Sequence, residues 1–449
     1  MAIEFLSKLE FENSLMQNPT RRQLLQLLSA CGVSLALPGM TARAAMRRRD
    51  ERPKSLITLW MNGGMSQLET WDPHAGTKSG GEVHDIATSM GDTRISELLP
   101  QMAEQLHSCM LIRSLTSKEG DHERGAAYVK TGYRPEPTLK YPTLGSIVAH
   151  ELPDDKIEIP QYVTLAPDRI VPEGGYLGNQ WDAFRVFDPG SGLSNLKSYV
   201  SSERQTDRLQ GLNVVSQQFE QRRQFGAKRT LHQNTLERAL TMMSSVQLKA
   251  FELDTETASV KAAYGDSRFG RGCLVARRLV EVGVRSIEVT LPGFDTHVAN
   301  HSGHVTNCKI LDPAIATLIQ ELRDRDLLDS TIVLCISEFG RTPSINPASG
   351  RDHWPNWFSC MIAGGGFREG TVIGETPSDI SEGKDSDGKL RLASDPVQVP
   401  ELYATIMAAM GIDFSKEILT PIGRPMKFSD AKPSARLLKD DVASRVIKS

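Results

Sequence analysis

The sequence predicts an α/β fold built on a doubly wound, mostly parallel sheet, and two observations support this prediction. Short continuous apolar runs, which are typical of buried parallel strands, occur at 56–61, 109–114, 286–291, 331–337 and 358–364. Segments with helical periodicity lie among them, at 95–107, 122–131, 267–283, 311–325 and 400–411. Strands that alternate with helices favour helices on both faces of a single sheet.

The composition is that of an ordinary globular protein and excludes other classes. The 449 residues are 39% hydrophobic and 24% charged, close to the average for folded domains. With 52 Lys and Arg against 55 Asp and Glu, the chain lacks the basic excess that is typical of nucleic-acid-binding proteins. Its one clear apolar stretch, 24–37, is too short to span a bilayer permanently. We therefore expect no nucleic-acid partner and no permanent membrane span.

The N-terminal residues have the pattern of an export leader. Arg21 and Arg22 precede the apolar stretch, and Ala-Arg-Ala at 42–44 supplies the small-x-small pattern that a signal peptidase accepts. We interpret residues 1–44 as a twin-arginine signal peptide, the alternative being a buried amphipathic helix. This predicts the Tat export machinery as a partner and a periplasmic or secreted location. Because the twin-arginine route carries folded proteins, often around a metal or cofactor, it also favours a bound group.

The rest of the chain, 45–449, is interpreted as one α/β domain with a helical insertion. The segment 195–262 is rich in Gln, Glu, Arg and Leu and lacks strand-like runs, which predicts two or three amphipathic helices. Of the six cysteines, five lie outside the leader, and none forms a Cys-x-x-Cys pair. We expect these five to be small buried hydrophobic side chains, with one disulfide left open.

Ligands of doubly wound sheets bind beyond the carboxyl ends of the strands, so residues that follow predicted strands are the candidates for chemistry. The turn after the first strand contains Gly63, Gly64 and Ser66. It is either a backbone nest that receives an oxyanion or a tight strand-to-helix turn that needs glycine. Asp121 is a candidate N-cap that places His122 in the first turn of a helix, near positive backbone dipoles. The alternative is that Asp121 only caps the helix and that the three charged residues at 121, 123 and 124 lie on a solvated face.

A group of histidines follows the strand at 286–291. Asp295, His297, His301 and His304 all lie within ten residues. Spacings of four and three place the three histidines on one helical face, where they suit a transition metal, although a Ser-Gly pair interrupts that helix. The alternative is a set of solvated histidines at the start of a surface helix.

Two further charged loops follow the strand at 331–337. Glu338 suits a metal ion and Arg341 an anionic group, or the two residues belong to a buried ion pair. His353 suits a metal ligand with Asp352 as its orienting carboxylate, or these two are a loop-packing pair.

Together these motifs resemble the Tat-exported bacterial proteins of the domain-of-unknown-function 1501 family, which is grouped with the alkaline phosphatase and sulfatase superfamily. The matching stretches are GGMSQLETWDP, the Thr-Gly-Tyr at 131–133, GGYLGNQWDAFRVFDPG, RFGRGCLVARRLVEVGVRSIEV, FDTH, SEFGRTPSIN, GRDHW and GRPM. They run over nearly the whole chain after the leader. The resemblance implies an alkaline-phosphatase-like α/β fold, while the family itself has no settled activity.

The wider superfamily hydrolyses phosphate or sulfate esters at one or two metal ions, and the resemblance implies that the centre of this chain is altered. The acid that ends the first strand in the superfamily corresponds to Asn62 here. The nucleophile at the helix start, usually Cys, Ser or Thr, corresponds to His122. The Ser-Asp-His-Gly metal motif looks like Ser-Glu-Phe-Gly, which keeps a carboxylate at Glu338 and loses the histidine at Phe339.

The leading hypothesis is an exported metal-dependent hydrolase of sulfate or phosphate esters, acting on a small-molecule or glycan ester. The candidate ligands of a divalent ion are Asp295, His297, His301, Glu338 and His353. Zinc or manganese suits the histidines, and calcium or magnesium suits the carboxylates. His122 is a further ligand, a general base or a nucleophile, and Arg341 with Ser66 neutralises the anionic group. The alternative is a catalytically degenerate sulfatase-like envelope protein that binds anionic glycans or a partner protein.

Overall fold

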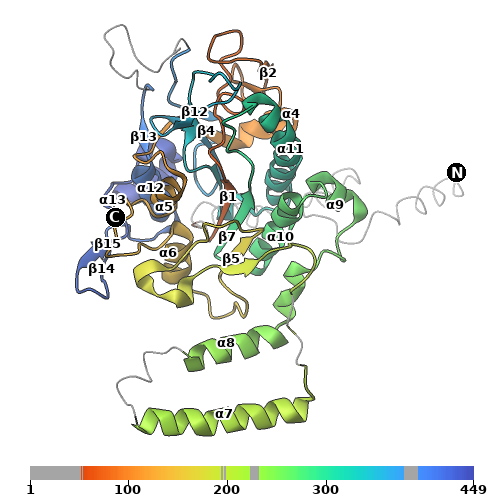
Figure 1. The fold of residues 1–449 in the computed structure, drawn as a ribbon, viewed down its shortest axis with the longest axis vertical. Helices are drawn as coiled ribbons and strands as arrows, with labels where there is room; N and C mark the ends of the chain where they lie inside the picture. The colour runs from red at the N-terminus through yellow and green to blue at the C-terminus, as the bar shows by residue number, and fades with distance from the viewer. Residues whose placement is uncertain are drawn as a thin grey trace, which may run out of the picture.

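A nine-stranded sheet forms the centre of the protein in the computed structural model (Figure 1). The structure describes residues 52, 54–193, 196, 199–222, 232–378 and 393–448, so the predicted signal peptide at 1–44 lies outside the described residues. The strands of the sheet are β1 (Ser55–Met61), β4 (Cys109–Thr116), β5 (Tyr162–Leu165), β6 (Phe184–Val186), β7 (Ser286–Leu291), β8 (Thr331–Ile336), β11 (Phe358–Gly364), β12 (Thr371–Ile373) and β13 (Val397–Gln398). Their order is β12-β4-β11-β8-β1-β7-β5-β6, and β13 pairs with β4. The described pairs are parallel except those of β11, which confirms the predicted mostly parallel sheet.

Helices cover both faces of the sheet (Figure 1). On one side lie α4 (Pro100–Gln105), α9 (Ala258–Tyr264), α10 (Arg268–Val282) and α11 (Asn300–Asp324), and on the other α5 (His122–Thr131), α6 (Leu144–Glu151), α12 (Val399–Met410) and α13 (Asp440–Lys448). Side chains of β1 alternate between the two layers, with Ile57 and Leu59 in the first and Leu56 and Trp60 in the second. A parallel sheet buried on both faces explains why its strands are continuous apolar runs.

The five predicted strands form β1, β4, β7, β8 and β11, with ends within two residues of the predicted bounds. The short strands β5 and β6 were not predicted. The predicted helix at 95–107 is wrong in its first half, because Arg94–Ser96 forms β3 and pairs with β2 (Asp85–Ala87). Only the later residues of that segment form α4.

Helix α11 is longer than predicted and begins at Asn300. The expected interruption at Gly303 is wrong, since Gly303 lies inside the helix. A Cβ on Gly303 would lie 2.7 Å from the side chain of Thr296, so glycine lets the helix pack against the loop after β7. Pro313 also lies within α11 without ending it.

Within the predicted insertion at 195–262, α7 (Ser202–Arg222) and α8 (His232–Ser244) extend away from the sheet (Figure 1). The chain returns through η5 (Val246–Phe251) and α9 to the layer of α10 and α11. The five cysteines outside residues 1–44 are buried, as expected, and all five are free. Among the described residues, no helix is long and apolar enough to cross a membrane.

The candidate site residues follow the ends of neighbouring parallel strands. Because β8, β1 and β7 are adjacent and parallel, the residues that follow them lie at the same edge of the sheet. The short strands β9 (Gly340–Arg341) and β10 (His353–Trp354) pair antiparallel above this edge, with Arg341 opposite His353. A separate hairpin joins β14 (Glu417–Leu419) to β15 (Pro425–Lys427).

A buried ion pair fixes α5 across the sheet. The Nζ of Lys130 lies 2.6 Å from Glu288 Oε1 in the middle of β7, and 4.4 Å from the centre of a Trp60 ring. Both charged side chains are almost fully buried. Since a buried charge without its partner is costly, this pair locks the position of α5 over β1 and β7.

Lys130→Met should destabilise the protein by about 3–5 kcal/mol, because it leaves the Glu288 carboxylate buried without a partner. Adding Glu288→Leu should restore much of the loss. Chemical denaturation measures both changes. As a control, Lys140→Met removes the exposed pair with Glu173 and should cost less than about 1 kcal/mol. A Lys130→Met loss as small as that of the control would contradict the assignment.

Candidate metal centre

The turn after β1 approaches the end of β7 so closely that it needs glycine. Gly63 has a φ of +113°, and a Cβ on it would lie 2.4 Å from the backbone nitrogen of Asp295. The carbonyl of Asn62 accepts the Phe294 N–H at 3.2 Å. The Gly63 N–H in turn donates to Glu338 Oε1 at 2.8 Å. These contacts bring the carboxylates that follow β7 and β8 to one place.

Glu338 orients the imidazole ring of His122, the first residue of α5. Asp121 caps the helix by accepting the Arg124 N–H at 3.1 Å, which confirms the predicted cap and starts α5 at His122. The Nδ1 of His122 lies 2.9 Å from Oε1 of Glu338, which is fully buried. Because a carboxylate only accepts, a neutral His122 carries its proton on Nδ1 and a lone pair on Nε2.

Two more histidines are held in the same way. The Nδ1 of His297 lies 2.8 Å from Asp352 Oδ1, and the Nδ1 of His353 lies 2.7 Å from the backbone oxygen of Gly120. Burial, more than any neighbouring charge, lowers the pKa of His353 and favours its neutral form. In their neutral forms, both histidines therefore present an unprotonated Nε2.

The three Nε2 atoms converge on Asp295. The Nε2 of His353 lies 3.0 Å from the Nε2 of His297 and 3.4 Å from Asp295 Oδ1. The Nε2 of His297 lies 3.2 Å from that same oxygen, and the Nε2 of His122 lies 3.2 Å from Oδ2. Ligand atoms of His122, Asp295 and His353 all lie within 4.8 Å of one another. We call His122, His297, His353 and Asp295 the cluster.

The geometry of the cluster favours a bound cation. With their Nδ1 protons committed, His297 and His353 turn lone pairs toward each other at 3.0 Å. The Nε2 of His122 lies 3.2 Å from Asp295 Oδ2, so in the neutral ring its lone pair faces a carboxylate oxygen. A proton or a metal ion relieves this repulsion. Three imidazoles and one carboxylate are a donor set that fits a divalent transition metal.

Arg341 keeps Asp295 ionised. It is fully buried, and its Nη2 donates to Asp295 Oδ1 at 2.8 Å. Burial alone would raise the pKa of Asp295, but the Arg341 hydrogen bond and charge, with His122 and His297, lower it to about 2. The cluster therefore contains a carboxylate that is charged at any physiological pH.

The structure places Asp295, His297 and His353 together, as the ligand hypothesis expects, and it also brings His122 to them, which favours the further-ligand alternative for that residue. Glu338 reaches the cluster through His122 and occupies the position of an orienting carboxylate. Arg341 was expected to neutralise an anionic group. Its described side-chain hydrogen bonds go to Asp295 and to backbone carbonyls, so the guanidinium is engaged within the protein. The alternative, a buried ion pair with Glu338, is also wrong, because the carboxylate that Arg341 pairs with is the half-exposed Asp295.

The remaining candidates lie elsewhere. His297 precedes α11, so the expected single helical face of three histidines is wrong. His304 is fully buried, donates from Nδ1 to the Asn300 carbonyl at 2.9 Å and accepts the Ser66 N–H at 3.0 Å. His301 lies outside the cluster. Ser66 is fully buried and its N–H is taken by His304, so it does not face an oxyanion. The strand-to-helix alternative is right about the need for glycine and wrong about the helix, since the described residues between β1 and β2 form no helix.

Some supporting residues carried no clear signal in the sequence. Gly120 contributes a backbone carbonyl, which any residue type provides. Asp352 was expected to orient His353, and it orients His297 instead. Arg351, one residue earlier, is fully buried beneath the site and was not singled out at all.

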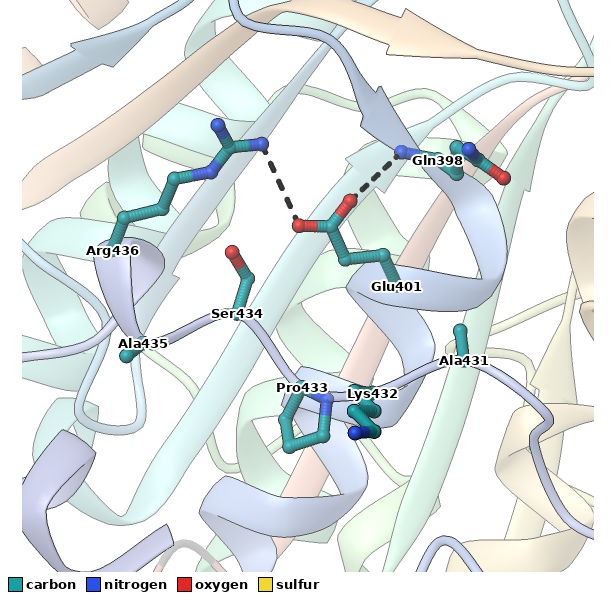
Figure 2. Close-up of a pocket in the computed structure, with 8 residues that line it drawn as sticks. All are labelled: Gln398, Glu401, Ala431, Lys432, Pro433, Ser434, Ala435 and Arg436. Atoms are coloured by element: carbon teal, nitrogen blue, oxygen red, sulfur yellow. Dashed lines mark hydrogen bonds and ion pairs between the residues drawn. The ribbon is translucent and has the colours of Figure 1, made fainter. Parts of the chain in front are cut away.

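A pocket lies apart from the cluster, between the start of α12 and the segment 431–436 (Figure 2). Within it, Glu401 accepts the Gln398 N–H at 3.4 Å and lies 3.5 Å from Arg436 Nη2. None of the predicted site residues lines this pocket. Its carboxylate is engaged, so the cluster remains the better candidate for chemistry.

A family match decides what kind of protein carries this cluster. The family described as "Protein of unknown function (DUF1501)" matches residues 53–440. The chain belongs to this family. The resemblance drawn from the motifs is thereby confirmed. No curated protein matches the chain.

The fold is similar to those of several solved enzymes of low sequence identity. The lipoteichoic acid synthase LtaP from Listeria monocytogenes is 7% identical, with a TM-score of 0.38, over 90% of this chain and 81% of that chain. The PsFucS1 sulfatase from Pseudoalteromonas sp. is 9% identical, with a TM-score of 0.37, over 82% and 70%. A TAB5 alkaline phosphatase mutant with bound Mg is 11% identical, with a TM-score of 0.34, over 81% and 99%.

Glu338→Gln should lower the pKa of His122 in metal-free protein. The hydrogen bond that His122 donates to Glu338 is the largest cause that raises the pKa of His122, outweighing burial. NMR titration of the histidine Cε1–H signals measures the change, and an unaltered His122 titration would contradict the assignment.

The raised pKa of His122 also makes the stability of the protein depend on pH. A raised pKa in the folded state stabilises the protein fully below the unfolded pKa of about 6.5, and this contribution is lost as the pH rises through the folded value. The unfolding free energy of wild type minus that of Glu338→Gln should therefore be larger at about pH 5.5 than at about pH 9. Denaturant titrations at both pH values test the sign.

Proposed function

We propose that the protein is a metal-dependent hydrolase of phosphate or sulfate esters that uses a single divalent ion. The observation that carries the proposal is the convergence of three Nε2 atoms on one carboxylate, with every Nδ1 held by an acceptor. His122, His297, His353 and Asp295 would hold the ion. Their side chains are between 23% and 49% exposed, so a ligand reaches them from solvent.

The donor set favours zinc or manganese over calcium or magnesium. Imidazole nitrogen suits borderline transition metals, whereas calcium and magnesium prefer sites built from oxygen. Glu338 is fully buried, and both of its oxygens are already engaged: Oε1 accepts from His122 and Gly63, and Oε2 accepts from the Ser337 hydroxyl at 3.2 Å. We therefore assign one ion rather than two to these residues.

A bound divalent ion polarises an ester oxygen and lowers the pKa of water. The chain's own residues prepare the site for this. Arg341 keeps Asp295 ionised, and Glu338 and Asp352 fix the rings of His122 and His297. The positive end of the α5 dipole lies at the cluster and favours an anionic phosphate or sulfate group.

Water is the nucleophile in this proposal. Both ring nitrogens of His122 are committed, Nδ1 to Glu338 and Nε2 to the cluster. A covalent role for His122 would break one of these arrangements. The substrate class is a small-molecule or glycan ester, and export by the twin-arginine route would place its hydrolysis in the periplasm or outside the cell.

Protein purified without added metal or chelator should contain about one equivalent of zinc or manganese, and it should hydrolyse p-nitrophenyl phosphate or p-nitrophenyl sulfate. His297→Ala and His353→Ala should each lower metal affinity and activity by at least roughly 100-fold, since each removes a ligand. Elemental mass spectrometry and a chromogenic assay measure the two effects.

His301→Ala is the matched control, because it removes a nearby histidine that lies outside the cluster. It should leave metal content and hydrolysis unchanged. A wild type that binds no metal and hydrolyses neither ester while folded would contradict the proposal.

The export step is tested separately. Replacing Arg21 and Arg22 with lysine should retain the protein in the cytoplasm, since the arginine pair is the recognised element of the leader. Fractionation of cells followed by immunoblotting measures the distribution. Equal export of the double variant would argue for another route or for an uncleaved N-terminal helix.

A further inference from the structure

A second buried ion pair lies beneath the loops that carry the cluster. The Nε of Arg351 donates to Glu69 Oε1 at 3.0 Å, across 282 residues of sequence. Arg351 is 0% exposed and Glu69 is 2% exposed. Neither residue belongs to the cluster. The pair is therefore candidate support for the site and does not act on a ligand directly.

The guanidinium of Arg351 joins the loop after β1 to the loop after β8. Its Nη1 donates to the carbonyls of Thr342 and Pro343 at 3.1 and 2.7 Å, and its Nη2 donates to the carbonyl of Ser79 at 2.7 Å. Together with the bond to Glu69, these bonds engage every nitrogen of the guanidinium within the protein, so none is left for a ligand. A lysine has a single nitrogen in place of the three guanidinium nitrogens, so it can make only some of these hydrogen bonds.

The backbone of Arg351 adds the loop after β7. Its N–H donates to the Thr296 carbonyl at 3.1 Å, and its own carbonyl accepts from Arg341 Nη1 at 3.0 Å. Thr296 lies between Asp295 and His297. Arg351 itself directly precedes Asp352 and His353. One residue thus sets the distance between the two loops that supply most of the cluster.

Glu69 anchors the other end of the pair. It lies on the turn that begins at Ser66, whose N–H donates to Nε2 of the buried His304 on α11. Burial would raise the pKa of Glu69, but the charge of Arg351, together with hydrogen bonds to Ser66 and Asn300, lowers it. The carboxylate is charged, so Arg351 is held by an ion pair as well as by its hydrogen bonds.

We propose that Glu69 and Arg351 are positioning residues that hold the His297 loop and the His353 loop at the separation needed to bind one metal ion. The inference rests on the proposed function, since it concerns the same cluster. It also gives the GGMSQLET turn a role: its buried carboxylate fixes the loop that ends in His353. Residues that orient ligands in this way typically change metal affinity by about 10- to 100-fold when they are replaced.

The test compares metal affinity in three full-length variants, Glu69→Gln, Arg351→Lys and Arg277→Lys. Arg277, on α10, is the matched control, because it is an equally buried arginine that pairs with Glu256 and Glu321 and does not belong to the cluster. Zinc and manganese are titrated into metal-free protein by competition calorimetry. Thermal unfolding of the same samples reports the loss of stability.

Glu69→Gln and Arg351→Lys should weaken metal binding by about 10- to 100-fold, whereas Arg277→Lys should lower the unfolding temperature and leave metal affinity unchanged. Glu69→Gln keeps the shape of the side chain, so it decides the matter if Arg351→Lys fails to fold. Wild-type affinity in Glu69→Gln would overturn the inference, as would an equal loss in Arg277→Lys. A wild type that binds no metal overturns the proposed function and the inference with it.

Discussion

The cluster depends on where each imidazole places its single proton. A neutral histidine offers one nitrogen as a ligand only when the other gives its proton to an acceptor. The fold provides three such acceptors from three different sources: a buried carboxylate after β8, a carboxylate in the loop before β10, and a backbone carbonyl before α5. Without them the rings would rotate and present either nitrogen.

Buried charge is the second constraint on the site. Arg341 and Arg351 are fully buried guanidinium groups, and each is paired with a carboxylate and bonded to backbone carbonyls of neighbouring loops. An unpaired buried charge costs several kcal/mol, so the loops are stable only when they meet at these two groups. The fixed positive charge of Arg341 beside Asp295 also repels a second cation and so disfavours its binding.

The hydrophobic pattern predicted much of the fold because buried parallel strands need continuous apolar runs. With the rule that ligands bind beyond strand ends, it also pointed to the carboxyl ends of β7 and β8, where three of the four cluster residues lie in the segments that follow. What it did not predict depends on contacts between distant segments. The choice of His122 over His301 follows from the start of α5 reaching Glu338, the second residue after β8. The spacing of histidines along the chain contains no information on that contact.

The roles of individual side chains were harder to predict than their positions. Arg341 and Ser66 have types that suit an anion site, yet both are fully buried. Glu338 is a suitable metal ligand by type, but its Oε1 already accepts from Gly63 and His122. In each case burial and the available hydrogen-bond partners, which are properties of the folded state, decide between the alternatives.

The most direct test is a crystal structure of the zinc-loaded protein with data collected at the zinc absorption edge. The central claim predicts a single anomalous peak at roughly 2.0–2.2 Å from the Nε2 atoms of His122, His297 and His353 and from an oxygen of Asp295. Glu338 should stay bonded to Nδ1 of His122. A peak elsewhere, or one coordinated by Glu338 in place of His122, would contradict the account.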